Sequence, residues 1–180
     1  IVWVLAELCG VEAEVVRNDP IRAYLLLSNP HTGNGAVQVL FTPTRVVCSN
    51  TLRAAENWAK NVMRVVHSKN LQLELSAVRE AVDVAQNTFS FSLKHYRAMA
   101  RKKISVNGLR DYVRKVFEVP DEVTDMPQSW EGIEAAFEAG PGSDIPGVGG
   151  TVWNAYNAIT YWLDHVRGRN DASRLKATWF

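Results

Sequence analysis

Cysteine is scarce in this sequence, which has only Cys9 and Cys48 among its 180 residues. They lie far apart and neither belongs to a Cys-x-x-Cys pair, so a disulfide-framework domain and a cysteine-based zinc site are both excluded. Both cysteines lie in apolar surroundings. We therefore expect buried, reduced thiols, as is usual for a cytoplasmic protein.

Long apolar runs are also absent. The longest, at residues 1–5 and 24–27, are far shorter than the roughly 20 residues of a membrane-spanning helix, so we expect no membrane partner. No basic region or cleavage site marks a secretory signal near Ile1. Residues 1–180 are expected to form a single domain. Because the chain begins and ends in apolar residues, we interpret it as a fragment that lacks the N-terminal part of the full protein.

Recognisable catalytic motifs are absent as well. No two of the four histidines have metal-ligand spacing, and no Gly-x-Ser-x-Gly elbow occurs. The glycine-rich segments 33–35 and 147–150 are not followed by Lys-Ser or Lys-Thr, which excludes a nucleotide-hydrolase phosphate loop. The sequence therefore favours a protein without catalytic residues, cofactor or metal, and leaves an enzyme open as an alternative.

The first third of the chain predicts an antiparallel sheet. Strands are expected at residues 1–8, 21–28, 36–41 and 61–67, which are rich in β-branched and aromatic side chains. Residues 21–41 form a β-hairpin, because the turn signal at 29–35 contains two glycines. Thr42-Pro43 predicts the start of a helix over residues 45–55. The apolar run 46–48 suits a strand as an alternative.

The remaining chain predicts helices. Apolar residues at steps of three and four indicate a long helix from about 71 to 100. Ser105 or Asn107 can cap a second helix that ends near 117, and further helices are expected at 130–139 and 151–166, separated by a flexible loop at 140–150. This order predicts the α+β class: an antiparallel sheet with a β-hairpin, packed by a long helix and shorter C-terminal helices.

Charge is divided into two opposed blocks beneath a formal net charge of +1. Residues 94–115 carry Lys94, Arg97, Arg101, Lys102, Lys103, Arg110, Arg114 and Lys115 against Asp111 alone, and every charged residue in 118–144 is acidic. Clustered Lys and Arg displace counterions from phosphates. The interleaved Tyr96, Tyr112 and Phe117 could stack bases, as single-strand binders do. Alternatively, this is a solvated helix end whose basic block pairs with the acidic one, within a subunit or between subunits.

A second basic set comprises Arg45, Arg53, Lys60, Arg64 and Lys69. In the predicted helix, Arg45 and Arg53 lie two turns apart on nearly one face, where both could contact phosphate. The alternative is that Arg45 and Asn50 hold the following loops by hydrogen bonds. The predicted nucleic-acid contacts are Arg45, Arg53, Arg64, Arg97, Arg101, Lys102, Lys103, Arg110 and Arg114.

Three segments carry a family resemblance: residues 24–29 with the following His31-Thr32-Gly33, residues 41–55, and residues 150–165. Together with Val2–Ala6 they resemble the phage- and plasmid-like proteins that carry the domain of unknown function 932. The resemblance implies carriage on phages, prophages and plasmids, and a longer N-terminus. It implies no catalytic residues. Thr32 departs from the family, where an acidic residue is commoner.

These observations lead to two functional hypotheses. The first is a cytoplasmic protein that binds single-stranded DNA in replication or in recombination and annealing. It agrees with a fold-level analogy, because a hairpin-rich sheet backed by a long helix is similar to phage single-strand annealing proteins. The alternative is an oligomeric structural or protein-interaction module without catalytic activity. Aromatic residues on more than one face of the last helix also suggest self-association.

Overall fold

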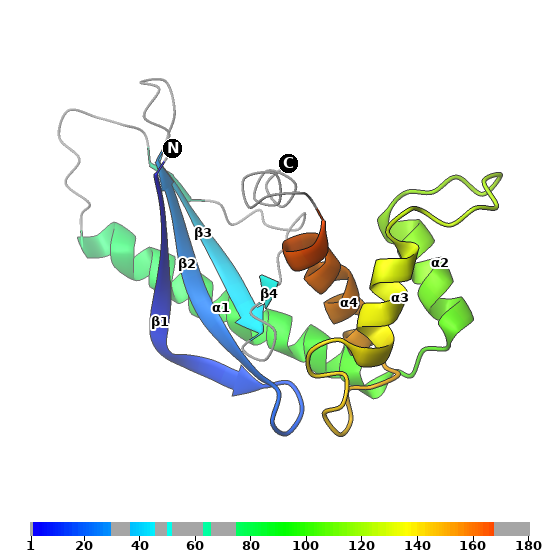
Figure 1. The fold of residues 1–180 in the computed structure, drawn as a ribbon. Helices are drawn as coiled ribbons and strands as arrows, with labels where there is room; N and C mark the ends of the chain where they lie inside the picture. The colour runs from blue at the N-terminus through cyan, green and yellow to red at the C-terminus, as the bar shows by residue number, and fades with distance from the viewer. Residues whose placement is uncertain (1, 30–36, 46–49, 52–62, 66–74, 168–180) are drawn as a thin grey trace.

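The computed structural model describes residues 2–29, 37–45, 50–51, 63–65 and 75–167. Figure 1 shows the sheet at one side of the molecule, one long helix lying along it, and the shorter helices at the other side. The strands are β1 Val2–Glu14, β2 Pro20–Asn29, β3 Val37–Arg45, β4 Asn50–Thr51 and β5 Met63–Val65. The helices are α1 Leu75–Arg101, α2 Val106–Val116, α3 Trp130–Ala139 and α4 Val152–Tyr161, which continues as a π-helical segment Trp162–Val166.

The sheet is an antiparallel meander in the order β1-β2-β3, with β4 and β5 pairing to opposite ends of β3. The predicted hairpin is confirmed by the pairing of β2 with β3, and its loop at 30–36 lies outside the described residues. The predicted strand at 61–67 is confirmed at 63–65, and its other residues are not described. The sheet and the helices together confirm the α+β class.

Strand β1 is longer than predicted because it passes through a bulge. Its register against β2 shifts between Glu7 and Glu12, and Gly10 in this stretch has a φ of +78°. Only glycine adopts such a φ without steric cost, and a bulge there bends the strand (Figure 1). The expectation of a buried Cys9 is wrong: the side chain is exposed in this unpaired stretch of an edge strand. Cys48 lies outside the described residues.

The helix predicted to start at Thr42-Pro43 is wrong. Both residues belong to β3, where Thr42 pairs with Tyr24 and Pro43 with Ala23. Phe41, Pro43 and Arg45 are buried while Thr44 is half-buried, which is the alternation of a strand with one face on the core. Burial of this face outweighs the local capping signal. Positions 46–49 and 52–55 lie outside the described residues.

Helix α1 covers the sheet, as the apolar periodicity predicts. Its buried residues Ala85, Phe89, Tyr96 and Ala100 share one core with residues of β2 and β3, and the rings of Phe41 and Phe89 meet edge to face with centroids 6.4 Å apart. A second core joins α2, α3 and α4 around Leu109, Val113, Ile133 and Ile159. None of the helices within the described ranges is both long and apolar enough to cross a membrane.

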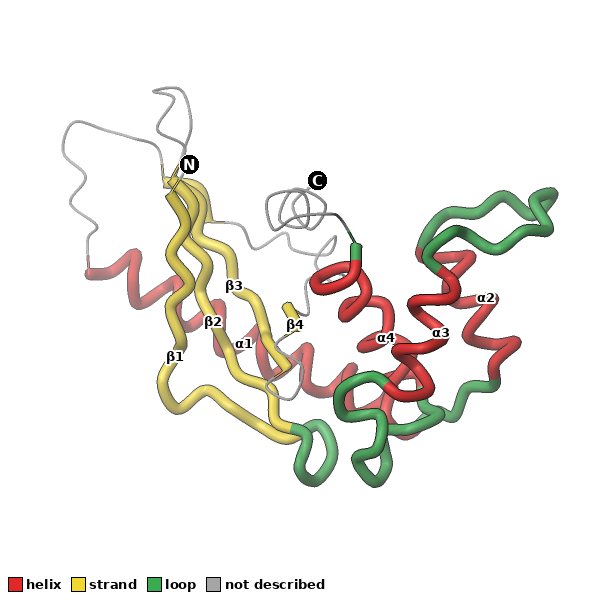
Figure 2. The backbone as a smooth tube through the Cα atoms, in the orientation of Figure 1, coloured by secondary structure: helices red, strands yellow, loops and turns green. Residues whose placement is uncertain are grey.

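The helical part has close to the predicted bounds. Ser105 is one of the two predicted caps, whereas Thr151, predicted as the first residue of the last helix, instead caps α4. Helix α3 has its predicted bounds, and α2 and α4 begin after caps at Ser105 and Thr151. The Ser105 Oγ accepts from the Gly108 N–H at 3.2 Å, and the Thr151 Oγ1 accepts from the Asn154 N–H at 3.1 Å. The segment between α3 and α4 turns back beside the β1–β2 turn (Figure 2), where Val15 and Val148 belong to the same core.

The Thr151 cap gives a test of how the segment between α3 and α4 is held. Its hydroxyl is fully buried and also donates to the carbonyl of Val148, so Thr151→Val should leave a donor and an acceptor unsatisfied. We expect the free energy of unfolding to fall by about 2 kcal/mol in urea titration. Ser105→Ala is the matched control, because that cap is exposed, and its loss should be about 1 kcal/mol or less. Equal losses would contradict the buried role of Thr151.

Candidate functional site

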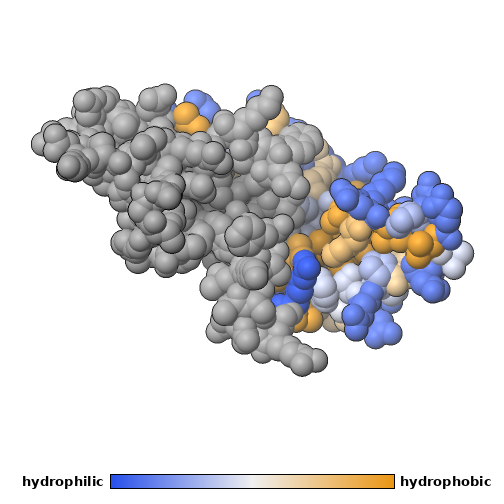
Figure 3. Space-filling model, turned by 90° about the horizontal axis from the view of Figure 1, so that it is seen from above, coloured by the Kyte–Doolittle hydropathy of each residue, from blue (hydrophilic) through white to orange (hydrophobic). Residues whose placement is uncertain are grey.

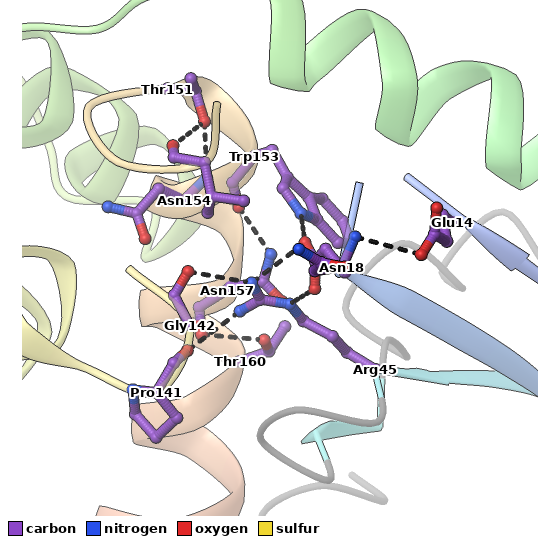
Figure 4. A network of polar contacts seen from close by, with 12 residues as sticks. Glu14, Asn18, Arg45, Pro141, Gly142, Thr151, Trp153, Asn154, Asn157 and Thr160 are labelled. Atoms are coloured by element: carbon purple, nitrogen blue, oxygen red, sulfur yellow. Dashed lines mark hydrogen bonds and ion pairs between the residues drawn. The ribbon is translucent and has the colours of Figure 1, made fainter. Parts of the chain in front are cut away.

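A buried ion pair lies where the sheet meets the helical part (Figure 4). Arg45, the last residue of β3, donates from Nε to Asp19 Oδ1 at 2.7 Å and from Nη2 to Asp19 Oδ2 at 3.0 Å. Both side chains are at most 1% exposed. The parallel two-bond geometry is the strongest arrangement that a guanidinium and a carboxylate can form.

Further partners complete this network, which we call the Arg45 junction. The indole Nε1 of Trp153 in α4 donates to Asp19 Oδ2 at 2.7 Å. Arg45 also donates to the backbone carbonyls of Pro141 and Gly142, at 3.1 and 3.3 Å. The ring of Tyr96 from α1 lies 4.9 Å from the Trp153 ring. The junction therefore joins the β1–β2 turn, β3, the 140–150 segment and α4, with α1 packed against it.

The prediction that Arg45 contacts nucleic acid is wrong in this structure, because its side chain is buried and fully engaged inside the protein. The alternative, in which Arg45 and Asn50 hold the following loops, is confirmed only in that Arg45 holds a loop by hydrogen bonds. The loop, at Pro141 and Gly142, is remote in the sequence. Arg53 lies outside the described residues. Arg64 belongs to β5, and its side chain lies outside the described part of the structure.

The exposed basic residues gather at the C-terminal end of α1. Lys94, Arg97 and Arg101 follow one another at steps of three and four, so they share one side of the helix, and all three are exposed. Arg97 donates twice to the carbonyl of Glu14, at 3.2 and 2.8 Å, which places it beside the β1–β2 turn that carries the exposed Arg17. The basic end, as we define it, comprises Arg17, Lys94, Arg97, Arg101, Lys102 and Lys103.

The basic end is not neutralised by the acidic block. Lys103 Nζ donates to the carbonyl of Gly149 at 3.1 Å, which is a neutral partner. In the part of the chain that the structure describes, the ion pairs are those of Arg22 with Glu7 and Glu12 and that of Arg45 with Asp19. None of them joins residues 94–115 with residues 118–144. Pairing of these two blocks within one subunit therefore has no support among these residues, and pairing between subunits stays a prediction.

The remaining predicted contacts lie on α2 and have partners within the protein. The Arg110 guanidinium lies 5.2 Å from the centre of the Trp130 ring in α3. Arg114 Nη2 donates to the carbonyls of Pro120 and Val123, at 2.8 and 2.6 Å. These two residues help to hold α3 and the segment after α2, so the predicted set does not form one continuous surface of free cations.

The aromatic residues expected to stack bases are mostly inside. Tyr96 is buried, burial raises the pKa of the Tyr112 hydroxyl, and Phe117 packs edge to face on Trp162 at 6.0 Å. Sequence reasoning missed Phe91, which is 56% exposed on α1. A signal was present, because Phe91 precedes Lys94 by one turn and falls outside the buried apolar series of the helix.

The fold and the site together define an α+β domain in which a buried arginine–aspartate pair joins a β-meander to a helical part and a basic helix end remains exposed. The chain belongs to the family described as domain of unknown function DUF932, whose model matches residues 1–179. The predicted presence of the domain of unknown function 932 is thereby confirmed. Comparisons with curated proteins and with solved structures gave no significant match.

The Arg45 junction predicts a large effect of a small substitution. Asp19→Asn keeps the shape of the side chain but leaves the buried Arg45 charge uncompensated, so we expect the free energy of unfolding to fall by about 3–5 kcal/mol. Urea titration followed by tryptophan fluorescence measures it. Glu12→Gln is the matched control, since its ion pair with Arg22 is exposed, and should cause no measurable change. If the two variants were equally stable, the junction would not hold the domain together.

Proposed function

We propose that this protein binds single-stranded nucleic acid through the basic end of α1. The observation that carries the proposal is an exposed cluster of Lys and Arg, from the end of α1, the two residues after it and the β1–β2 turn, that forms no ion pair with a described carboxylate. Such a cluster attracts a phosphodiester backbone, because each phosphate that it neutralises releases condensed counterions.

Two further points favour a single strand over a duplex. An exposed aromatic ring, Phe91, lies on the same helix as the cluster, and single-strand binders combine a basic track with aromatic platforms. The meander backed by a long helix also agrees with the analogy to single-strand annealing proteins, although a fold does not define a function. Given the resemblance to phage and plasmid proteins, we place this binding in the replication or recombination of a mobile element, in the cytoplasm.

A second candidate is self-association without nucleic-acid binding. Val116 and Val123 are 41% and 43% exposed beside the end of α2, and Figure 3 shows apolar residues among charged ones at the end of the molecule remote from the sheet. Light scattering distinguishes the two candidates. A stable oligomer that Val116→Glu dissociates, in a protein that binds no oligonucleotide, would favour the second.

The proposed binding should depend on Arg101 and Lys102. Both are exposed, so Arg101→Gln/Lys102→Gln should lower the free energy of unfolding by less than about 1 kcal/mol. We expect the double variant to bind a short single-stranded oligonucleotide more weakly, with a slope of log K against log salt about 1.4 smaller, or about 0.7 for each phosphate that is no longer neutralised. Fluorescence anisotropy over roughly 50–200 mM salt measures both quantities.

The control for this experiment is Arg22→Gln, which removes one positive charge that Glu7 and Glu12 already neutralise. Its affinity and salt slope should remain those of the unsubstituted protein. Absence of binding at low salt would eliminate the proposal. If the slope of log K against log salt were unchanged in the double variant, the interface would not lie at the end of α1.

A further inference from the structure

Phe91 lies on the outward face of α1. With 100° between successive residues of a helix, Phe91 points about 160° away from Phe89, which is buried against the sheet. Phe91 is the only aromatic residue among the exposed large apolar side chains of the described chain. Phe91 belongs to neither of the two cores of the described chain, so more than half of its surface is open to a ligand.

A second ring completes this feature. His95, one turn after Phe91, has its imidazole centre 4.4 Å from the Phe91 ring centre, with 50° between the ring planes. The His95 Nδ1 atom lies 3.0 Å from the carbonyl oxygen of Phe91, which fixes the imidazole beside the helix backbone. The two rings therefore form one aromatic surface on the outside of α1.

Positive charge lies on one side of this surface. Lys94 is one turn from Phe91, and Arg101 is about 15 Å further along the helix axis than Phe91. In the other direction the nearest ionisable residue on α1 is Asp83, about 12 Å away and exposed. A strand of phosphates that passes the rings is thus attracted toward the basic end, and no ionisable residue of α1 lies close to the rings on the other side.

We propose that Phe91 and His95 form a stacking platform for an unpaired base of a single strand whose phosphates are bound by Lys94 and the basic end. This inference rests on the proposed function. It adds recognition of the unpaired base, which positive charge alone does not select. Stacking on a ring is possible for every base, so the platform would favour single strands without selecting a sequence.

The experiment compares two labelled strands of about 16 nucleotides, the upper end of site sizes for single-strand binding modules. One is oligodeoxythymidylate, and the other is an abasic strand with the same number of phosphates. Both are titrated with the full chain and with Phe91→Leu, which keeps an apolar side chain and removes the ring. We expect Phe91→Leu to weaken binding of the thymidylate strand by roughly 5-fold or more and to leave binding of the abasic strand unchanged.

Two companion variants separate the ring from general effects. Phe91→Trp should retain the affinity for thymidylate, since indole offers a larger stacking surface. Val84→Ala should change neither strand, although Val84 is also exposed, on the same face of α1 two turns earlier. All of these substitutions are on the surface and should leave thermal unfolding nearly unchanged.

The outcomes distinguish this inference from the proposed function. Salt-dependent binding of equal strength to both strands, unchanged in Phe91→Leu, would overturn the platform and leave the basic interface in place. No binding of either strand would overturn both proposals. If Phe91→Leu instead dissociated an oligomer in light scattering without altering binding of either strand, the ring would belong to a contact between copies of this chain, and the platform would again be overturned.

Discussion

The rest of the structure depends on the ion pair between Arg45 and Asp19. It is buried at the only place where the end of β3, the β1–β2 turn, the 140–150 segment and α4 are linked by hydrogen bonds in the described chain. Desolvating two charges is expensive, and the geometry repays it only if every donor and acceptor finds a partner. Here Trp153 and two backbone carbonyls supply those partners. The pair therefore specifies one arrangement of the sheet relative to the helices.

That arrangement also determines the exposed surface. The junction fixes the β1–β2 turn through Asp19, and Arg97 of α1 then binds the carbonyl of Glu14 at the start of that turn. Arg17 is thereby brought beside the end of α1, although it is remote from the other cations in the sequence. The buried arginine and the exposed cations thus differ in role: Arg45 orders the framework, and the others leave positive charge on the surface.

Charge segregation gives the domain a local field that its net charge of +1 conceals. Because no described ion pair cancels the basic end against residues 118–144, the two regions act on partners separately. Screening limits such a field to about 8 Å at physiological salt. A charged ligand would therefore have to come into contact with the basic end, close to the exposed Phe91 ring, for this field to act on it.

The sequence by itself determined the elements whose signals are local. Apolar spacing specified α1, Ser105 specified the start of α2, and the β-branched runs specified the meander, because each of these depends on neighbours within a few residues. Only the tertiary structure decided which side chains are accessible. Arg45 is buried, with hydrogen bonds to Asp19 and Pro141. Tyr96 packs against Trp153, and Pro43 lies in a strand. Their partners are remote in the sequence, and burial is a property of the assembled core that a local pattern does not contain.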